Sequence, residues 1–284
     1  MAIKNRYDFV MLFDVENGNP NGDPDAGNSP RVDAETGYGY ITDVCLKRKI
    51  RNYVELSMSG AEGYNILIKP DKSLNTKFTE AYKEEGLTVK NKGKNPDDVK
   101  KARDFMCKKY YDVRTFGAVM STGDDPCGIV RGPVQINFAR SLSPINIQDI
   151  TITRQARTTE ERKETGETEM GKKSIIPYAL YRAEGYVSAA LANKVTDLSE
   201  EDLELLWTSI MNMFENDHSA ARGKMCMRKL YIFKHSNELG NCPSHLLFDK
   251  IAVKPLNSVP REFGDYEIEL DKEMPAGVEL IEKL

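Results

Sequence analysis

The chain has few cysteines and no long apolar run. Its 284 residues include five scattered cysteines and no Cys-x-x-Cys pair. An odd, scattered set argues against a disulfide framework, and no histidine stands at zinc-finger spacing from a cysteine. We therefore expect reduced thiols in core or boundary positions and a cytoplasmic protein. Because there is no apolar stretch of about 20 residues and no signal-peptide core, we expect no membrane association. The cysteines are Cys45, Cys107, Cys127, Cys226 and Cys242.

Motifs for nucleotide and covalent chemistry are also absent. No phosphate-binding loop of the form G-x-x-x-x-G-K-[ST] occurs, and no G-x-G-x-x-G follows a strand. The three histidines have no paired serine or cysteine motif, so no nucleophilic triad is predicted. Acids between residues 14 and 43 could be read as a Mg²⁺ nuclease site, because hard cations need clustered oxygen ligands. Most of them lie in a turn-forming loop, however, so we predict no catalytic residue, no metal and no cofactor.

A strong positive charge is missing as well. The net charge is −4 and the sequence pI is near 5.6. This argues against a protein that coats nucleic acid over its whole surface. It leaves room for a local basic groove, because the Debye length at physiological salt is only about 8 Å.

The most informative stretch is residues 7–54, which predicts a strand, a long loop and a helix. Apolar residues occupy both faces of Tyr7–Val15, as expected for a central strand. The loop that follows is rich in Gly, Asn, Asp and Pro, which cannot continue a strand. Thr42 is a suitable N-cap for the helix, with Asp43 in the first turn.

One face of this helix is basic. Lys47, Arg48 and Arg51 lie off its apolar stripe, and Lys47 and Arg51 are i, i+4 neighbours. A glycine-rich loop beside a basic helix N-terminus suits a repeating anion such as a nucleic-acid backbone. The alternative is a connecting loop beside an ordinary solvated helix face.

The rest of the chain predicts an α+β fold. Residues 58–112 read as a helical insertion, with a polar, lysine-rich loop at Gly86–Lys94 and a helix that starts at Asn95-Pro96. Val113–Ser121 reads as a strand, and residues 141–175 read as a protruding β-hairpin. Segments of helical and strand character follow the order β-α-β-β-α-β, which is ferredoxin-like and is also used by RNA-recognition domains. Arg131 beside Gly132 suits close approach to a phosphate, or else a bulge with an exposed Arg.

Several long segments resemble the backbone subunit of CRISPR Cascade complexes, most closely its type I-C form. They cover most of the first two thirds of the chain. They are YDFVMLFDVENGNPNGDPDAGN and TDVCLKRKIRNYV in residues 7–54, FGAVMS (116–121), VRGPVQINFARSLSPI (130–145), ITRQ (152–155) and IPYALYRAEGYVSAALA (176–192).

This resemblance implies a single domain over residues 1–284, shaped like a hand. An RNA-recognition-motif or ferredoxin-like palm would carry the helical insertion 58–112 and a β-hairpin thumb, 141–175. The usual aromatic motif of RNA-recognition domains is missing, which favours contact with the RNA backbone rather than with bases. The RNA-contacting residues implied are Thr42, Lys47, Arg48 and Arg51 on the helix, with Asn19, Arg31 and Arg131, and Arg154, Arg157, Met170 and Lys172 in the thumb.

The same resemblance implies a non-catalytic subunit with many partners. Copies would stack head to tail along the CRISPR guide RNA, beside other Cascade subunits, and present the guide for pairing with invading double-stranded target DNA in antiviral defence. A helicase-nuclease recruited by the complex would cut the DNA. The alternative is a metal-dependent ribonuclease, because related backbone subunits of type III complexes cut RNA.

Overall fold

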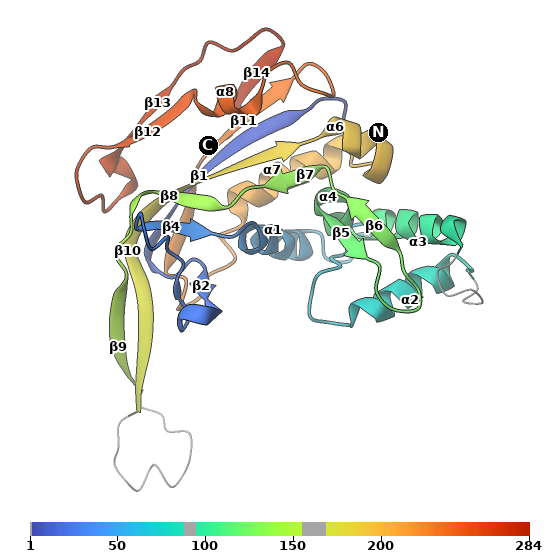
Figure 1. The fold of residues 1–284 in the computed structure, drawn as a ribbon, viewed down its shortest axis with the longest axis horizontal. Helices are drawn as coiled ribbons and strands as arrows, with labels where there is room; N and C mark the ends of the chain where they lie inside the picture. The colour runs from blue at the N-terminus through green and yellow to red at the C-terminus, as the bar shows by residue number, and fades with distance from the viewer. Residues whose placement is uncertain (1, 88–94, 155–168) are drawn as a thin grey trace, which may run out of the picture.

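The main sheet of the protein is antiparallel, with helices on one face and a C-terminal layer on the other. A computed structural model describes residues 2–87, 95–154 and 169–284. The strands of the main sheet lie in the order β14-β11-β1-β10-β8-β4, and β7 and β9 pair with other parts of β10. Figure 1 shows this sheet, the helical part beside it, and the hairpin that projects away from both.

The helices and strands alternate in small groups along the chain. The helices are α1 (Asp43–Ser57), α2 (Leu74–Glu84), α3 (Pro96–Lys109), α4 (Tyr111–Phe116), α6 (Ala189–Leu191), α7 (Glu200–Asn212) and α8 (Ser244–Phe248). The strands up to the hairpin are β1 (Tyr7–Gly18), β2 (Gly22–Asp23), β3 (Ser29–Pro30), β4 (Tyr38–Ile41), β5 (Gly117–Met120), β6 (Gly128–Arg131), β7 (Val134–Ile136), β8 (Ala139–Pro144), β9 (Gln148–Arg154) and β10 (Glu169–Val187). The later strands are β11 (Lys224–His235), β12 (Ile251–Pro255), β13 (Tyr266–Leu270) and β14 (Val278–Glu282).

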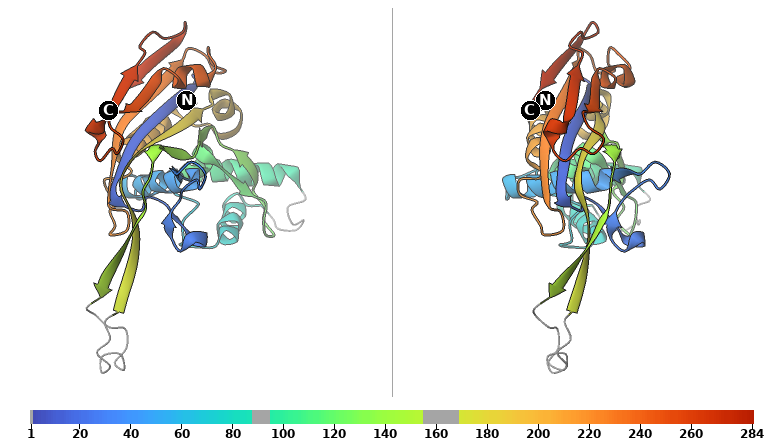
Figure 2. Two further views of the ribbon diagram at one scale, coloured as in Figure 1. Left: turned by 60° about the vertical axis from the view of Figure 1, so that its left-hand side comes forward. Right: turned by 90° about the vertical axis from the view of Figure 1, so that its left-hand side faces the viewer.

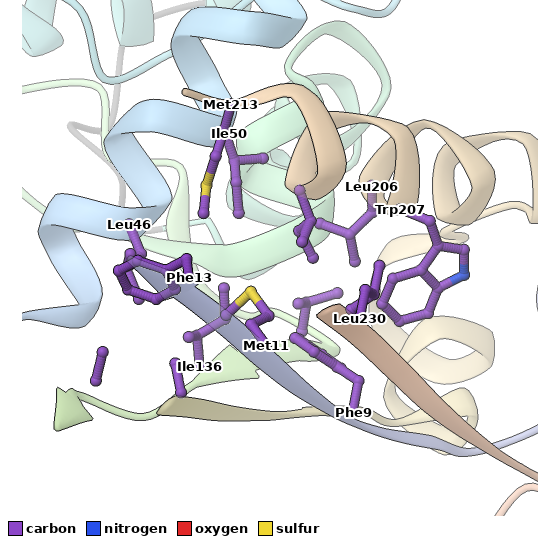
Figure 3. Packing of buried hydrophobic residues seen from close by; sticks show 14 of the residues in the cluster. Phe9, Met11, Phe13, Leu46, Ile50, Ile136, Leu206, Trp207, Met213 and Leu230 are labelled. Atoms are coloured by element: carbon purple, nitrogen blue, oxygen red, sulfur yellow. The ribbon is translucent and has the colours of Figure 1, made fainter. Parts of the chain in front are cut away.

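Strand β1 is the centre of the sheet, as its two apolar faces predict. It pairs antiparallel with β10 on one side and with β11 on the other. Phe9, Met11 and Phe13 point toward α1 and α7 and are fully buried there (Figure 3). Trp207 of α7 packs edge-to-face on Phe9, with ring centroids 5.2 Å apart, so it is a core residue.

The other face of β1 is covered by the C-terminal part of the chain. Val10 and Leu12 are fully buried and pack in a cluster with Phe248 of α8, Ile251 of β12 and Tyr266 of β13. Figure 2 shows these elements lying across the sheet on the side away from α1. The sequence shows no recognisable motif in residues 215–284. Of these, α8, β12 and β13 form the layer over the second face, whereas β11 and β14 are strands of the sheet itself.

One predicted strand is wrong in its first half. The sequence predicts an extended segment over Val113–Ser121, but Tyr111–Phe116 form the helix α4 and only Gly117–Met120 form a strand. Gly117 has a φ of 81°, and an added Cβ would lie 2.4 Å from the carbonyl oxygen of Val130. This glycine ends the helix and turns the chain into β5, so the β-branched Val113 and Thr115 are helical despite their strand propensity.

Helices α2, α3 and α4 and the strands β5 and β6 enclose a second apolar cluster beside the main core. Phe78, Tyr82, Met106 and Val130 are among its buried members. The start of α3 agrees with the cap expected from the sequence, since the Asn95 side chain accepts from the amide of Asp97 and Pro96 stands at the first helical position. Residues 88–94, which include the predicted lysine-rich loop, lie outside the described residues.

The hairpin of β9 and β10 projects from the sheet in all three ribbon views (Figures 1 and 2). Its described ladder runs from Ile175 opposite Gln148 to Glu169 opposite Arg154. The tip, residues 155–168, lies outside the described residues. No helix within residues 2–87, 95–154 and 169–284 combines the length and apolarity that a bilayer span requires.

A buried ion pair joins the helical part to the main core. The guanidinium of Arg114 in α4 donates from Nε to Oδ2 of Asp202, over 2.9 Å, and from a terminal nitrogen to Oδ1, over 2.7 Å. Asp202 also closes the capping box of α7 with Ser199. Both side chains are nearly inaccessible to solvent, so neither charge has water as an alternative partner.

We therefore expect Arg114→Ala to destabilise the protein by about 3–5 kcal/mol, because the carboxylate of Asp202 would stay buried without its cation. Chemical denaturation monitored by circular dichroism measures this. The control is Lys254→Ala, which removes an exposed pair with Glu269 and should cost no more than about 1 kcal/mol. Equal losses of stability for the two variants would contradict the structural role of Arg114.

Candidate nucleic-acid interface

A groove lies where the glycine-rich loop meets α1, the segment 217–222 and the start of β10. It consists of two adjoining hollows, of about 250 and about 290 Å³. Asn19, Asn28 and Ala221 line both, so the hollows are continuous. The first extends along α1, and the second extends to the base of the projecting hairpin.

The loop is held in place by polar contacts that its sequence supplies. The amide of Asn19 donates to the carbonyl of Ala221 over 2.8 Å, and its side-chain nitrogen donates to the carbonyl of Asn28 over 2.6 Å. Gly18 passes so close to the carbonyl of Arg222 that an added Cβ would lie 1.8 Å from the oxygen. Only glycine allows this approach, so the loop rests directly on the segment 217–222.

The same loop is attached to the N-terminus of α1. Oδ1 of Asn21 accepts from the amide of Thr42 over 3.0 Å and from its hydroxyl over 3.1 Å. The Thr42 hydroxyl oxygen in turn accepts from the amide of Cys45, which confirms the predicted N-cap. Thr42 therefore has a structural role in joining loop and helix.

Exposed basic side chains lie along this groove. Arg48 of α1 is exposed and lines the first hollow, and Lys172 of β10 is exposed and lines the second. Between them, Lys173 donates to the carbonyl of Ala220, and Arg222 pairs with Asp217 over 3.2 Å. Basic side chains therefore line the groove from one end to the other.

Two of these basic residues, Lys173 and Arg222, and the buried Lys49 were not among the predicted site residues. Lys49 forms an ion pair with Asp217, and that pair anchors the segment 217–222 to α1. No local pattern around Arg222 marks it as a site residue. It reaches the groove only because β11 runs beside β1 and brings the preceding turn against Gly18.

Lys47 and Arg51 lie together, as their spacing predicts, but on another side of α1. Their cations lie over the ring of Phe116, 5.7 and 5.2 Å from its centroid. Lys47 pairs with Asp43 over 2.9 Å, and Arg51 pairs with the buried Asp112, also over 2.9 Å. Both cations therefore already have anionic partners within the chain.

The other predicted residues are distributed between these two places. Arg31 lies 3.4 Å from Asp23 beside the loop. Arg131 is exposed at the end of β6, where Gln135 bridges toward Lys47. Arg154 and Met170 belong to the β9–β10 ladder, opposite Glu169 and Thr153. Arg157 lies outside the described residues.

The acids of residues 14–43 do not converge. Asp14 accepts from Arg228 and from the hydroxyl of Tyr178, and burial raises the pKa of its carboxyl although Arg228 opposes the rise. Asp33 accepts from the Thr36 hydroxyl, which holds the pKa of that carboxyl below its usual value. Among the described residues, no three His, Cys, Asp or Glu side chains are grouped as metal ligands would be.

Cys45 contributes a thiol to the groove. Burial raises the pKa of this thiol above its ordinary value, although Lys49 and Arg222 act in the opposite direction. A neutral, shielded thiol is a poor nucleophile.

The structure thus defines an antiparallel α/β protein with a basic groove beside a helix N-terminus. A sequence model of the family described as "CRISPR-associated protein Cas7" matches residues 5–271. The chain belongs to the Cas7 family of CRISPR-associated proteins.

Individual proteins are also similar to this chain. A relative described as "CRISPR-associated protein Cas7", from Haloferax volcanii (strain DS2), is 27% identical over 258 residues, which are 85% of this chain and 73% of the relative. Among solved structures, a chain of a "CRISPR RNA-guided surveillance complex" has a TM-score of 0.48 and 11% identity, with 80% of this chain and 68% of that chain covered. A chain from a pre-nicking form of such a complex has a TM-score of 0.47 and 14% identity, with coverage of 80% and 78%.

Substitutions on the two basic sides of α1 should differ in their effect on stability. Arg51→Ala would leave the buried Asp112 without its cation, and only the hydrogen bonds from the amides of Leu67 and Ile68 would remain. We therefore expect a loss of about 3 kcal/mol. Arg48→Ala removes an exposed side chain and should change the free energy of unfolding by less than about 0.5 kcal/mol. Denaturant titration of both variants checks this, and a stable Arg51→Ala protein would show that the pair with Asp112 is dispensable.

Proposed function

We propose that this protein is a non-catalytic backbone subunit that binds CRISPR guide RNA in a Cascade complex of type I-C. The observation that carries the proposal is the continuous groove from Arg48 to Lys172, on a chain of the Cas7 family. The amino-acid resemblance to the type I-C form, described above, supports the finer assignment.

The groove favours the RNA backbone over the bases. Arg48 and Lys172 supply cations, while backbone amides and the N-terminus of α1 add partial positive charge. Such interactions carry no sequence information, so any guide could be held in the same way. The base edges would remain free to pair with target DNA.

The sheet order supports a ferredoxin-like palm. Strands β8, β10, β1 and β11 are neighbours and antiparallel, α1 follows β1, and α7 precedes β11. We assign residues 58–112 as the helical insertion and residues 141–175 as the thumb. A thumb that reaches a neighbouring copy would give a head-to-tail contact, and a contact of that kind generates a helical filament. Other Cascade subunits and the recruited helicase-nuclease would bind the assembled filament.

Removal of groove cations should weaken RNA binding equally for all sequences. For Arg48→Ala with Lys172→Ala we expect about tenfold weaker binding of single-stranded RNA. The slope of log affinity against log salt should fall by about 1.4, which is about 0.7 for each phosphate that is no longer neutralised. Fluorescence anisotropy with two RNAs of unrelated sequence measures both quantities.

The matched control removes two lysines from the C-terminal layer. Lys254→Ala with Lys272→Ala takes away the same charge from exposed positions far along the chain from the groove. Affinity and salt slope should then stay near the wild-type values. Weaker binding of one RNA sequence alone, or equally weakened binding in the control, would argue against backbone contact in the groove.

The isolated protein should assemble on RNA without cutting it. With RNAs of increasing length, light scattering should show the complex gaining mass in steps of one subunit, because each copy covers a fixed length of guide. Labelled RNA incubated with Mg²⁺ should remain intact. Cleavage that a chelator stops, and that Asp23→Asn with Asp25→Asn abolishes, would replace this proposal with the metal-dependent ribonuclease.

A further inference from the structure

A third hollow, of about 500 Å³, lies on the face of the sheet that the groove does not use. Strands β4, β8 and β10 and the segment between β7 and β8 form it, and Tyr38, Phe138, Arg140 and Glu184 are among its lining residues. None of its lining residues lines the two hollows of the groove. It is therefore a separate feature of the surface.

The strand register explains why aromatic side chains gather here. Ile41 and Ala139 are opposite each other in β4 and β8, and both point into the main core. Their neighbours Tyr40 and Arg140, also opposite each other, must then point to the other face of the sheet.

The C-terminal layer stops short of this end of the sheet. Arg182 of β10 marks its border, because the guanidinium donates to the carbonyls of Phe248 over 2.8 Å and Ile251 over 2.6 Å. The layer still reaches the far end of β8, where the hydroxyls of Ser143 and Tyr266 lie 3.1 Å apart, but it leaves Phe138 and Arg140 exposed.

The rings at this open end are arranged in parallel. Tyr40 and Phe138 have centroids 6.3 Å apart and planes inclined by only 6°. The guanidinium of Arg140 lies over the ring of Tyr38, 4.5 Å from its centroid. Phe138 is 56% exposed, an unusual position for a phenylalanine that packs on no core.

We propose that this cluster is a stacking site for an unpaired base of single-stranded nucleic acid. The proposal rests on the proposed function, and it adds a contact to bases that the basic groove does not make. Base–aromatic stacking tolerates any sequence, because every base has a π-face. Parallel rings and a guanidinium already seated on a ring are the groups that proteins use for such stacking.

The hollow also offers polar groups to the edge of a base. Glu184 lines it with a part-exposed carboxylate, which is paired with Arg182 over 3.0 Å. A carboxylate accepts a hydrogen bond from an exocyclic amino group. Asn137, also in the lining, offers an amide for a base edge.

The test compares two ligands of equal length and charge: a single-stranded oligouridylate and the same ribose-phosphate chain without bases. For Tyr40→Leu with Phe138→Leu, we expect about tenfold weaker binding of the oligouridylate and unchanged binding of the abasic chain. Leucine keeps apolar bulk but has no π-face. In addition, 4-thiouridine in the oligomer should crosslink to wild-type residues 38–40 or 138 when irradiated.

Phe105→Leu is the control, since Phe105 is a part-buried aromatic of α3 that stacks with Lys109 away from this hollow. It should leave both affinities unchanged. Arg140→Lys provides a second variant, which keeps the positive charge but loses the planar guanidinium, and it should weaken only the oligouridylate. Thermal melting of each variant shows whether it is folded.

Three results would overturn the inference. The first is equally weakened binding of both ligands in folded variants. The second is that the wild type binds the oligouridylate and the abasic chain equally well and that the variants bind both as tightly as the wild type does. The third is an effect on self-association without nucleic acid, which would make the hollow an interface between copies. Should the wild type bind neither ligand, the proposed function falls together with this inference.

Discussion

Strand β1 buries five consecutive apolar side chains, from Phe9 to Phe13, on its two faces, and the rest of the protein is arranged to cover them. Two helices cover one face, and a separate C-terminal layer covers the other. Hydrogen bonding makes the same demand, because a strand buried on both faces needs partners on both edges. Strands β10 and β11 supply them. The end of β1 therefore lies between the starts of α1, β10 and β11, which is where the groove forms.

Buried ion pairs divide the basic residues into two groups. Lys49, Arg51 and Arg114 each meet a largely buried carboxylate and hold distant segments together. Arg48 and Lys172 are exposed and line the groove. Exposed and buried cations have the same sequence signature, since both are lysines and arginines on helix or strand faces. Only the position of the matching acid, far away in the chain, separates a structural cation from one available to a ligand.

Local patterns predicted the elements that depend on local physics. Three predictions needed only neighbouring residues: the two apolar faces of the strand at residues 7–15, the Thr42 cap and the helix start at Pro96. All three features are present. The helix at 111–116 was missed because it is short and buries charged residues as well as apolar ones: Asp112 and Arg114 alternate with Tyr111 and Val113, a pattern typical of a strand. Only part of the groove was predicted from the sequence. Its loop and helix are continuous in sequence, but Arg222 and Lys173 reach it through long-range strand pairing.

A net negative chain can still bind a polyanion when its acids are elsewhere or already paired. Of the two acids that line the groove, Asp217 is neutralised by Lys49 and Arg222, whereas Asp149 is exposed and accepts from the hydroxyl of Ser174. In the C-terminal layer, Asp271 and Glu269 are likewise paired, with Lys250 and Lys254. The position of each charge, rather than their sum, therefore decides where a polyanion could bind, and the groove combines the exposed Arg48 and Lys172 with an acid, Asp217, that two cations neutralise.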